Sequence, residues 1–447
     1  AITVVPDLHP TINVQKFADS TDSKLLFFVG DASDDYGLMS LSFNYRLKKE
    51  KGAQADLNTV KMRKPDARQI QYDYTWDLTE MELGPGDELT YYFEVFDNDG
   101  VVGSKSARTN IMTFAMPTLD EIEELTEKNN DEIKKDLEES IKESKKIREE
   151  MKKLREKILQ EKEMDWQTRK ELEKLLERQK EMEQQMEEAK DKFEENVKNQ
   201  DEFEKPSEEL LEKQEKVQEL FEEVMDDEMK ELMKQIEELL QELEKDEALE
   251  MMEEMEMNDE EMEMELDRML ELLKQLEVEA EMEKTIDKLE ELAEEQEKLA
   301  EETEKEEKSQ EELEKEQEEI NKEFEEIQEK MEELEKKNEE LERPNDLGDH
   351  EEEMEDIEQD LNDSQEQLEQ KENQKASDSQ KKAAQKMKDM ANSMDMQMQS
   401  GAQEQMEEDM EALRQLLENL LGMSFEQEDL IDEIGGANIN TPRYVDL

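Results

Sequence analysis

The chain changes its chemical character near residue 118. Residues 1–118 hold 12 Lys and Arg against 18 Asp and Glu, a net charge of −6, and residues 119–447 hold the other 47 and 117, a net charge of −70. Charged residues make up 43% of the chain, compared with about 25% in an average globular protein. An acidic stretch rich in Glu, Lys, Leu, Gln and Met is typical of long helices. We therefore expect two differently built parts.

The first part alternates apolar and polar residues in the manner of half-buried antiparallel strands. This period-two pattern covers three segments: 41–47, 70–78 and 89–95. Further strands are expected near residues 11–16, 24–30 and 107–115, which brings the total to about six or seven. Turn sequences such as Gly84-Pro85-Gly86-Asp87 separate the segments. The pattern predicts a β-sandwich of the immunoglobulin or fibronectin type III kind.

Several residues of this sandwich have specific expected roles. The inward-facing set is expected to include Tyr72, Tyr74, Trp76, Phe93 and Val95. Leu89 lies where such modules often carry a corner tyrosine, so that hydrogen bond is expected to be absent or supplied by Tyr91. The turn Asp97-Asn98-Asp99-Gly100 begins like a calcium loop. A loop begun there would end at Arg108 and not at a bidentate Glu, which favours a hairpin turn.

The second part opens with a helix start signal, because Thr118 can cap a helix with Glu121 at the capping-box position. Apolar residues then recur at steps of three and four. Helix breaks are expected near Asp165-Trp166, at Pro206, near Asp246, at 344–348, and at Gly401 and Gly422. An uninterrupted heptad pattern over 285–341 predicts one coiled-coil rod of roughly 85 Å, tight over 320–334 and loose before it.

These patterns predict a segregated α+β fold with an N-terminal sandwich and a long, coiled-coil-rich helical arm. The expected regions are four: a β-sandwich over 1–117, a helical hairpin region over 118–245, a methionine-rich acidic helix with the long coiled coil over 246–343, and a truncated C-terminal helical region over 344–447. The coiled coil also makes an oligomer conceivable.

The sharpest local feature is the methionine-rich segment, residues 246–266, which holds eleven acids and no base. Its candidate interaction surface consists of six methionines: Met251, Met252, Met255, Met257, Met262 and Met264. Three interpretations remain open. A helix core is favoured, because Met251, Met255 and Met262 fall on one helical stripe. Methionine also suits an adaptable protein-binding surface, and thioethers suit Cu(I).

The chain contains a complement to this acidic segment. Residues 134–157 hold ten Lys and Arg against seven acids, a local net charge of +3, and carry their own stripe of Ile and Leu. We predict that the methionine-rich helix packs against this basic helix within the same chain. Burial of the stripes should dominate, because exposed ion pairs contribute only about 0–1 kcal/mol each. The charges should select the partner.

Composition argues against several classes of function. The acidic charge repels phosphate backbones and anionic lipid, so no nucleic-acid binding and no direct membrane contact by residues 1–447 are expected. The chain has no cysteine, and its two histidines, His9 and His350, lie far apart in sequence, which disfavours a zinc site. No phosphate-loop, dinucleotide or nucleophile-elbow motif occurs. We therefore expect no enzymatic activity, no catalytic residues, no cofactor and no metal.

Three stretches carry a family resemblance: DASDDYGL at 31–38, YYFEVFDNDGVVGSKSARTNIMTFAMPT at 91–118, and LRQLLENLLGMSFEQEDLIDE at 413–433, followed by TPRYVDL. They resemble Bacteroidota envelope proteins of domain-of-unknown-function family 4175. The resemblance implies membrane-spanning helices before residue 1 and a helical region that continues past residue 447. It also implies that the sandwich and arm lie on the periplasmic side of the inner membrane. The family supplies no catalytic residues.

Two hypotheses from different classes follow. The first is a non-enzymatic scaffold of the bacterial envelope, anchored through its N-terminal side, whose acidic helical arm docks protein partners of unspecified identity. The alternative is a periplasmic holdase-type chaperone that holds unfolded clients on hinged, methionine-rich faces. Apolar surface left exposed after folding would distinguish them. A methionine-rich metal-binding module is a third interpretation and rests on the methionine-rich segment alone.

Overall fold

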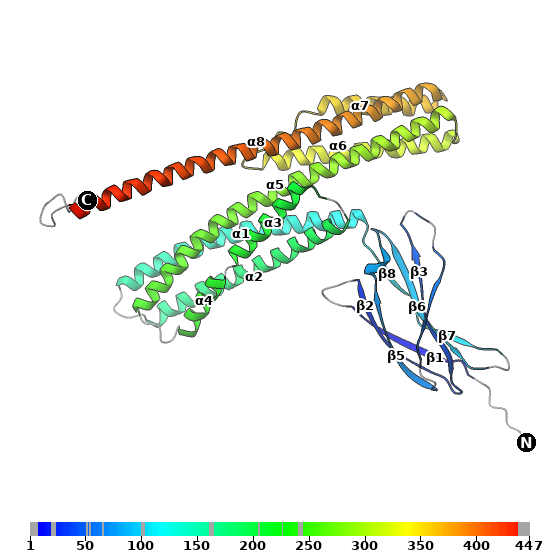
Figure 1. Ribbon diagram of the computed structural model, residues 1–447, viewed down its shortest axis with the longest axis horizontal. Helices are drawn as coiled ribbons and strands as arrows, with labels where there is room; N and C mark the ends of the chain where they lie inside the picture. The colour runs from blue at the N-terminus through cyan, green and yellow to red at the C-terminus, as the bar shows by residue number, and fades with distance from the viewer. Residues whose placement is uncertain are drawn as a thin grey trace, which may run out of the picture. The chain divides into compact units, whose positions relative to one another are not determined.

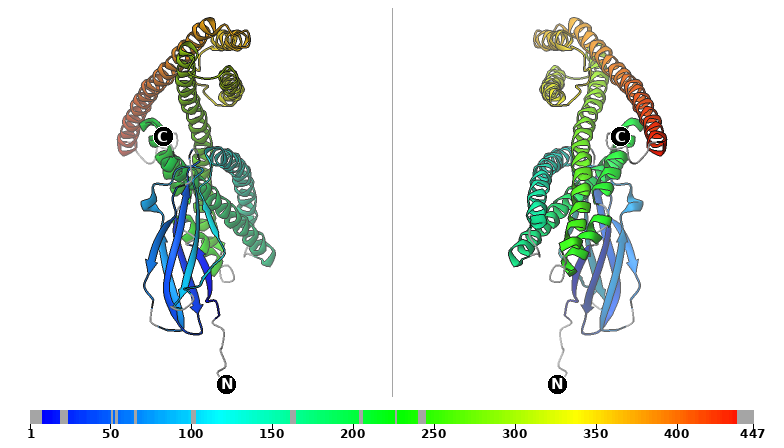
Figure 2. Two further views of the ribbon diagram at one scale, coloured as in Figure 1. Left: turned by 90° about the vertical axis from the view of Figure 1, so that its right-hand side faces the viewer. Right: turned by 90° about the vertical axis from the view of Figure 1, so that its left-hand side faces the viewer.

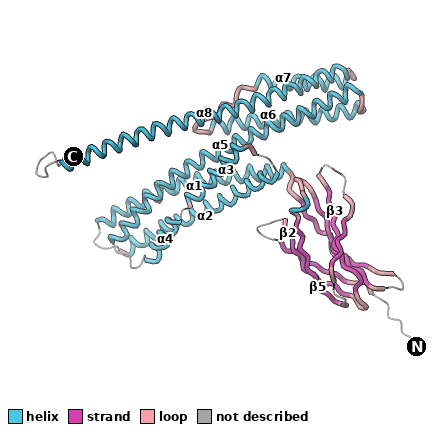
Figure 3. Tube along the Cα trace, viewed as in Figure 1, coloured by secondary structure: helices cyan, strands magenta, loops and turns pink. Residues whose placement is uncertain are grey.

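The computed structural model confirms a segregated α+β fold, with strands first and helices after them (Figure 3). The chain divides into two compact units, one formed by residues up to Asp136 with Gln184–Pro206, and one formed by Leu137–Glu183 with residues from Ser207 onward. The structure describes residues 8–18, 24–50, 52, 55–64, 67–99, 103–160, 165–203, 206–225, 227–239 and 245–436.

The first unit contains two antiparallel sheets. The three-stranded sheet has the order β1-β2-β5, with β1 at Thr11–Ala18, β2 at Leu25–Ser33 and β5 at Gln69–Asp77. The other sheet is built on the order β4-β3-β6-β7, with β4 at Asn58–Met62, β3 at Leu38–Lys48, β6 at Glu88–Asp97 and β7 at Ser106–Arg108. A further strand, β8 at Met112–Ala115, also pairs with β6.

The core of the sandwich follows from the alternation of its strands. Strand β6 buries every second residue, namely Leu89, Tyr91, Phe93 and Val95. Trp76, which is only 6% exposed, packs edge-on against Phe43 with ring centroids 4.7 Å apart. Of the expected inward set, only Tyr74 is half-buried and not buried. Period-two patterning therefore identified the core-facing side of the longer strands correctly.

Short and exposed strands were harder to predict. Strand β4 was not expected; it lies at a sheet edge where four of its five residues are exposed, so it has no alternation to detect. The strand expected over 107–115 is split at Thr109. The backbone N–H of Thr109 donates to the carbonyl of Phe93, and its Oγ1 accepts a hydrogen bond from the N–H of Phe93. The hydroxyl of Tyr91 is buried without a hydrogen-bond partner in the described part of the chain, so Tyr91 does not supply the corner bond.

The turn that resembled a calcium loop is held by its own backbone. The carboxylate of Asp97 accepts the N–H groups of Lys105 at 2.9 Å and Asp99 at 3.2 Å. Burial alone would raise the pKa of Asp97, but these hydrogen bonds lower it below its ordinary value. The first aspartate of the motif thus shapes the connection between β6 and β7.

Two long helices belong partly to the first unit and partly to the second. Thr118 and Glu121 form the expected capping box, with each side chain bonded to the backbone N–H of the other. Helix α1 spans Leu119–Gln160 and α2 spans Trp166–Phe203. Within the first unit the start of α1 lies against the end of α2, where Asn129 donates to Asn196 at 2.8 Å. An ion pair between Lys24 and Glu202 joins α2 to the sandwich.

The second unit is helical and is built around one continuous helix. It contains α3 at Glu208–Val224, α4 at Asp227–Leu239, α5 at Lys245–Lys305, α6 at Gln310–Glu339, α7 at Glu351–Glu369 and α8 at Asn373–Gly436. In Figures 1 and 2 the first half of α5 runs with α1 to α4, and its second half runs with α6, α7 and α8. Helices α5, α6, α7 and α8 share one apolar core, to which they contribute, in that order, Leu299, Phe324, Leu361 and Met387.

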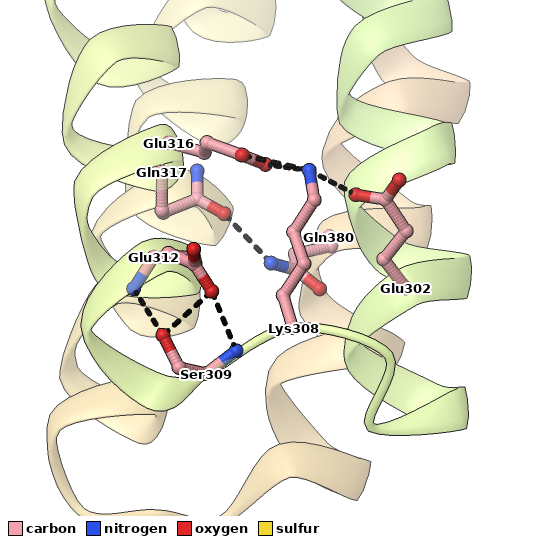
Figure 4. A network of polar contacts seen from close by, with 7 residues as sticks. All are labelled: Glu302, Lys308, Ser309, Glu312, Glu316, Gln317 and Gln380. Carbon is pink, nitrogen blue, oxygen red and sulfur yellow. Dashed lines mark hydrogen bonds and ion pairs between the residues drawn. The ribbon is translucent and has the colours of Figure 1, made fainter.

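The predicted single rod over 285–341 is wrong. Helix α5 ends at Lys305 and the chain folds back, so that Gln296 and Gln317 donate to each other at 3.0 and 3.1 Å. Figure 4 shows the connection: Ser309 caps α6 in a capping box with Glu312, and Lys308 lies between Glu302 and Glu316. The heptad pattern continues through the turn because both arms of the hairpin face the same core.

The other helix breaks were predicted with mixed success. The structure has interruptions at 165, 206 and 340–350, as expected, and α5 begins one residue before Asp246. Gly401 and Gly422 do not interrupt α8, because an isolated glycine costs only about 1 kcal/mol relative to alanine in a helix interior. The turn from α7 to α8, with Lys371 at φ +60°, was not predicted. In the described helices, none has both the length and the apolarity needed to cross a membrane.

Candidate functional site in the helical unit

The methionine-rich segment forms the first part of α5, and its six methionines do not share one surface. Met252 and Met255 are fully buried and Met262 is 7% exposed, whereas Met257 and Met264 are 62% and 68% exposed. Met251 is half-buried. Met252, Met255 and Met262 are separated by three and seven residues, a spacing that keeps them on the inward side of α5. The segment therefore serves mainly as core, with two methionines left on the solvent side.

The predicted packing against the basic part of α1 is confirmed by ion pairs that run along one side of the two helices. Arg148 contacts Glu263 at 2.9 Å, and Glu256 is held by Arg155 at 3.0 Å and Lys152 at 3.3 Å. Higher residue numbers on α1 match lower ones on α5, so the helices are antiparallel. The apolar stripe of α1 is buried at Ile141, Ile147, Met151, Leu154 and Ile158.

Helix α2 completes this packing as a third helix. Its Arg178 reaches α1, contacting Glu143 at 2.6 Å and Glu150 at 2.7 Å. Its Gln179 reaches α5 and donates to Oδ1 of Asp259 at 3.1 Å. Three helices of this unit therefore meet around one buried aspartate.

Asp259 is the most unusual group in this interface, because it is an acid with no exposed surface. Among the described residues its Oδ2 has no hydrogen-bond partner. Burial raises the pKa of Asp259 to about 7, against the opposing effects of Gln179 and Arg148.

Sequence reasoning missed Asp259, although a signal was present. Asp259 lies four residues after Met255 and three before Met262, which is the spacing of the buried stripe itself. Among eleven acids in the segment, a count of composition cannot single it out. Its position in the helical period does.

The middle of α5 carries acids that two different helices neutralise. Lys213 of α3 pairs with Glu279, while Lys337 of α6 pairs with Glu277 at 3.0 Å and also with Glu281. Burial would lower the pKa of Lys337, but the two glutamates raise it above its ordinary value. These contacts fix α5 where it passes from one set of neighbours to the next.

Helix α8 divides into a buried half and an exposed half. Its first half contributes Ala376, Ala383, Met387, Met390 and Met394 to the shared core. From residue 413 to 427, all nine side chains that the structure describes are exposed. We call residues 401–436 the α8 extension; in Figure 1 it continues, orange to red, beyond α6 and α7.

The α8 extension exposes large apolar side chains, with fractional exposures from 54% to 60% at Leu413, Leu417, Leu420, Leu421 and Met423. Leu413, Leu417 and Leu420 are spaced by four and three residues, so they lie along one side of the helix. In the sequence this stretch was noticed only for its family resemblance. Its leucine spacing was the available signal for a surface.

Another buried polar group of the unit, His350, has a structural role. His350 is buried and faces Glu353 at 2.6 Å through Nδ1 and Gln397 at 3.0 Å through Nε2, which holds the chain before α7 against α8. Across the residues described, no cluster of three or more His, Cys, Asp and Glu side chains is placed to hold a metal ion. No family model, curated protein or solved structure matches this chain.

Proposed function

We propose that this chain is a non-enzymatic scaffold that docks protein partners on its helical part, with the α8 extension as the docking element. One observation carries the proposal: the extension exposes Leu413, Leu417 and Leu420 along one side, on a helix whose first half is buried core. Burying one such side chain is worth about 1.5–3 kcal/mol. A partner that covers this side therefore gains substantial binding energy.

The methionine-rich segment is assigned a different role. Its inward methionines Met252, Met255 and Met262 already pack in the chain's own core. Met257 and Met264 remain exposed but lie seven residues apart, too few for a continuous apolar surface. In this proposal the segment stabilises the scaffold, and the docking surface lies on α8.

The proposed location is the periplasmic side of the inner membrane, with the anchor on the N-terminal side. It derives from the family resemblance of residues 31–38, 91–118 and 413–433. The third of these stretches coincides with the exposed part of α8. The resemblance and the exposed leucines thus direct attention to the same residues.

A holdase-type chaperone is the second candidate, because exposed leucines also attract unfolded chains. A scaffold binds a small set of folded partners at fixed stoichiometry, whereas a holdase binds many unfolded clients. The regular spacing of Leu413, Leu417 and Leu420, which suits a helix with a matching stripe, favours the scaffold.

Site-specific photocrosslinking tests the choice. A photoreactive amino acid replaces Leu417 in cells of the native host, and Met257, which is similarly exposed on α5, is the control position. The scaffold predicts one or a few discrete adducts at 417, absent at 257, which re-form at fixed stoichiometry from purified components. A smear of many adducts, with suppression of the aggregation of a heat-denatured enzyme, would favour the holdase. No adduct at 417 would contradict both.

A further inference from the structure

The two halves of α8 differ in charge as well as in burial. Residues 373–400 contain five Lys and three Asp, a net charge of +2, whereas residues 401–436 contain eleven acids and one Arg, a net charge of −10. The basic half is the packed half. The acidic half is the one that exposes its leucines.

Inside this unit, packed acidic stretches meet basic ones. The acidic start of α5 packs against the basic part of α1 through Arg148, Lys152 and Arg155. The basic half of α8 packs against acids of α5 and α7, with Lys388 on Glu297 and Lys386 on Asp360. In both places an apolar stripe is buried between opposite charges.

We infer that the occupant of the α8 extension is an amphipathic helix of a partner protein, with an apolar stripe flanked by Lys and Arg. This inference rests on the proposed docking function and specifies the chemistry of the partner. The leucines supply the binding energy, and the acids that precede and follow them in the sequence, at 404–411 and 426–433, favour a basic helix over others. The basic segment of α1 is the in-chain example of such a helix.

A second copy of the chain fits this surface poorly. Pairing two α8 extensions would bring net charges of −10 and −10 together, within chains that each carry −76. Like charges placed opposite each other oppose association and reduce its rate. Charge complementarity therefore favours a different protein as the occupant.

The size of the surface sets the size of the partner element. From Leu413 to Met423 the helix advances ten residues, or about 15 Å. A partner helix of about four to five turns covers this length in a helix-in-groove or paired-helix mode. Its recognition signature is Leu or Ile at steps of three and four, with Lys or Arg before and after this stripe, where they can reach the acids at 404–411 and 426–433.

Three labelled peptides of equal length and helix propensity test the inference by fluorescence anisotropy on the 447-residue chain. The first has a Leu stripe flanked by Lys and Arg, the second has the same stripe flanked by Glu, and the third is a scrambled form of the first without a stripe. The scrambled peptide is needed because any basic peptide is attracted to a chain of net charge −76.

Two variants of the chain complete the design. The test variant carries Leu413→Gln, Leu417→Gln and Leu420→Gln, which remove the stripe and keep both charge and helix propensity. The control variant carries Met257→Gln and Met264→Gln, the same kind of change at exposed positions of α5. Neither variant touches buried core, so both should keep the circular dichroism of the parent chain.

The expected result is selective binding by the first peptide. It should bind about tenfold or more tightly than either other peptide, lose about tenfold in the test variant, and change little in the control variant. Equal binding of the Glu-flanked peptide would overturn the charge selection while leaving docking by the leucines intact. Equal binding of the scrambled peptide would reduce the effect to diffuse attraction and overturn the inference.

The remaining outcomes separate this inference from the proposed function. If no peptide binds and sedimentation shows a dimer that the test variant abolishes, a second copy covers the surface and the inference is wrong. If no peptide binds and the chain stays monomeric, the inference is also wrong. Crosslinking at Leu417 then decides separately whether any protein docks there.

Discussion

Two acidic helical stretches of this chain hold the same number of acids, but one is packed and the other exposes its apolar residues. The methionine-rich segment of α5 holds eleven acids and no base, and the α8 extension holds eleven acids and one base. Both carry large apolar residues at steps of three and four. The first buries its stripe, at Met252, Met255 and Met262, and the second exposes Leu413, Leu417 and Leu420.

The difference between them lies in what the rest of the chain provides. The α5 segment faces the basic part of α1, so Lys and Arg side chains run along one side of its buried stripe. Acidity alone therefore does not keep a helix from packing. What matters is a second stripe to bury against and opposite charge beside it, and the described helices supply both to α5. Three changes test this comparison: truncation of one residue in each stripe, titration of the buried Asp259, and removal of an ion pair between α5 and α1.

The largest expected effect comes from truncating one residue of each stripe. Met255→Ala should destabilise the helical unit by about 2–5 kcal/mol, because Met255 is fully buried and its removal leaves a cavity. Leu417→Ala should change stability by no more than about 0.5 kcal/mol, since Leu417 is 54% exposed. Hydrogen exchange of α1 and α5, read by mass spectrometry, measures both effects locally.

Met257→Ala is the matched control for this pair, because it makes the same change at an exposed position of the same segment. It should behave like Leu417→Ala. Faster exchange throughout α1 and α5 in Leu417→Ala would mean that the α8 extension is packed after all. The comparison would then fail.

The second prediction uses the buried acid of the paired stretch. The pKa of Asp259 is about 7 in the folded chain and about 3.9 in an unfolded one, so ionisation disfavours the folded state. The stability associated with the protonated form is complete below about pH 4 and is lost as the pH rises to about 7. Asp259→Asn, which cannot ionise, should therefore stabilise the chain by about 2–4 kcal/mol at about pH 8 and much less at about pH 5.

Urea unfolding followed by circular dichroism at the two pH values measures this effect. The groups nearest to Asp259 include Gln179 of α2, Arg148 of α1 and Glu256 of α5, and all are retained in the variant. Asp267→Asn, at a largely exposed position of the same helix, serves as the control and should change the free energy of unfolding little. An equal shift at both pH values would show that the carboxyl of Asp259 is not the group responsible.

The smallest effect is expected from the flanking charges. Arg148→Gln removes contacts to Glu263 at 2.9 Å and Glu260 at 3.8 Å, and should cost about 1 kcal/mol, decreasing in high salt. Lys153→Gln, at a side chain that is 75% exposed, is the control and should have no measurable effect. A loss as large as that of Met255→Ala would mean that charge, and not burial, holds α5 to α1.

Much of this fold could be read from the sequence, and the misses have physical reasons. Strict alternation identified the strands that bury a full row of residues, such as β6, because only a buried face leaves that pattern. Strand β4 left none, since it is exposed at a sheet edge. The heptad pattern over 285–341 is the same for one rod and for a hairpin whose arms share a core. Only the local capping signal at Ser309 and Glu312 distinguishes them.

The candidate sites divide in the same way. The partner of the methionine-rich segment was predictable, because its charge and its stripe both had a visible complement at 134–157. Asp259 was hidden among ten other acids, and its burial depends on the approach of α1 and α2. The exposure of Leu417 could not be deduced from its type, because a leucine at helical spacing normally indicates core. Only the arrangement of the other helices determines whether such a residue is covered.

The continuity of α5 has a mechanical consequence. Its 61 residues, without a glycine or proline, form a shaft about 90 Å long that has no built-in hinge. The first part of α5 contacts α1 and α2, and its last part contacts α6 and the first half of α8. We therefore expect a force applied to the first half of α8 to be transmitted along α5 toward Asp259.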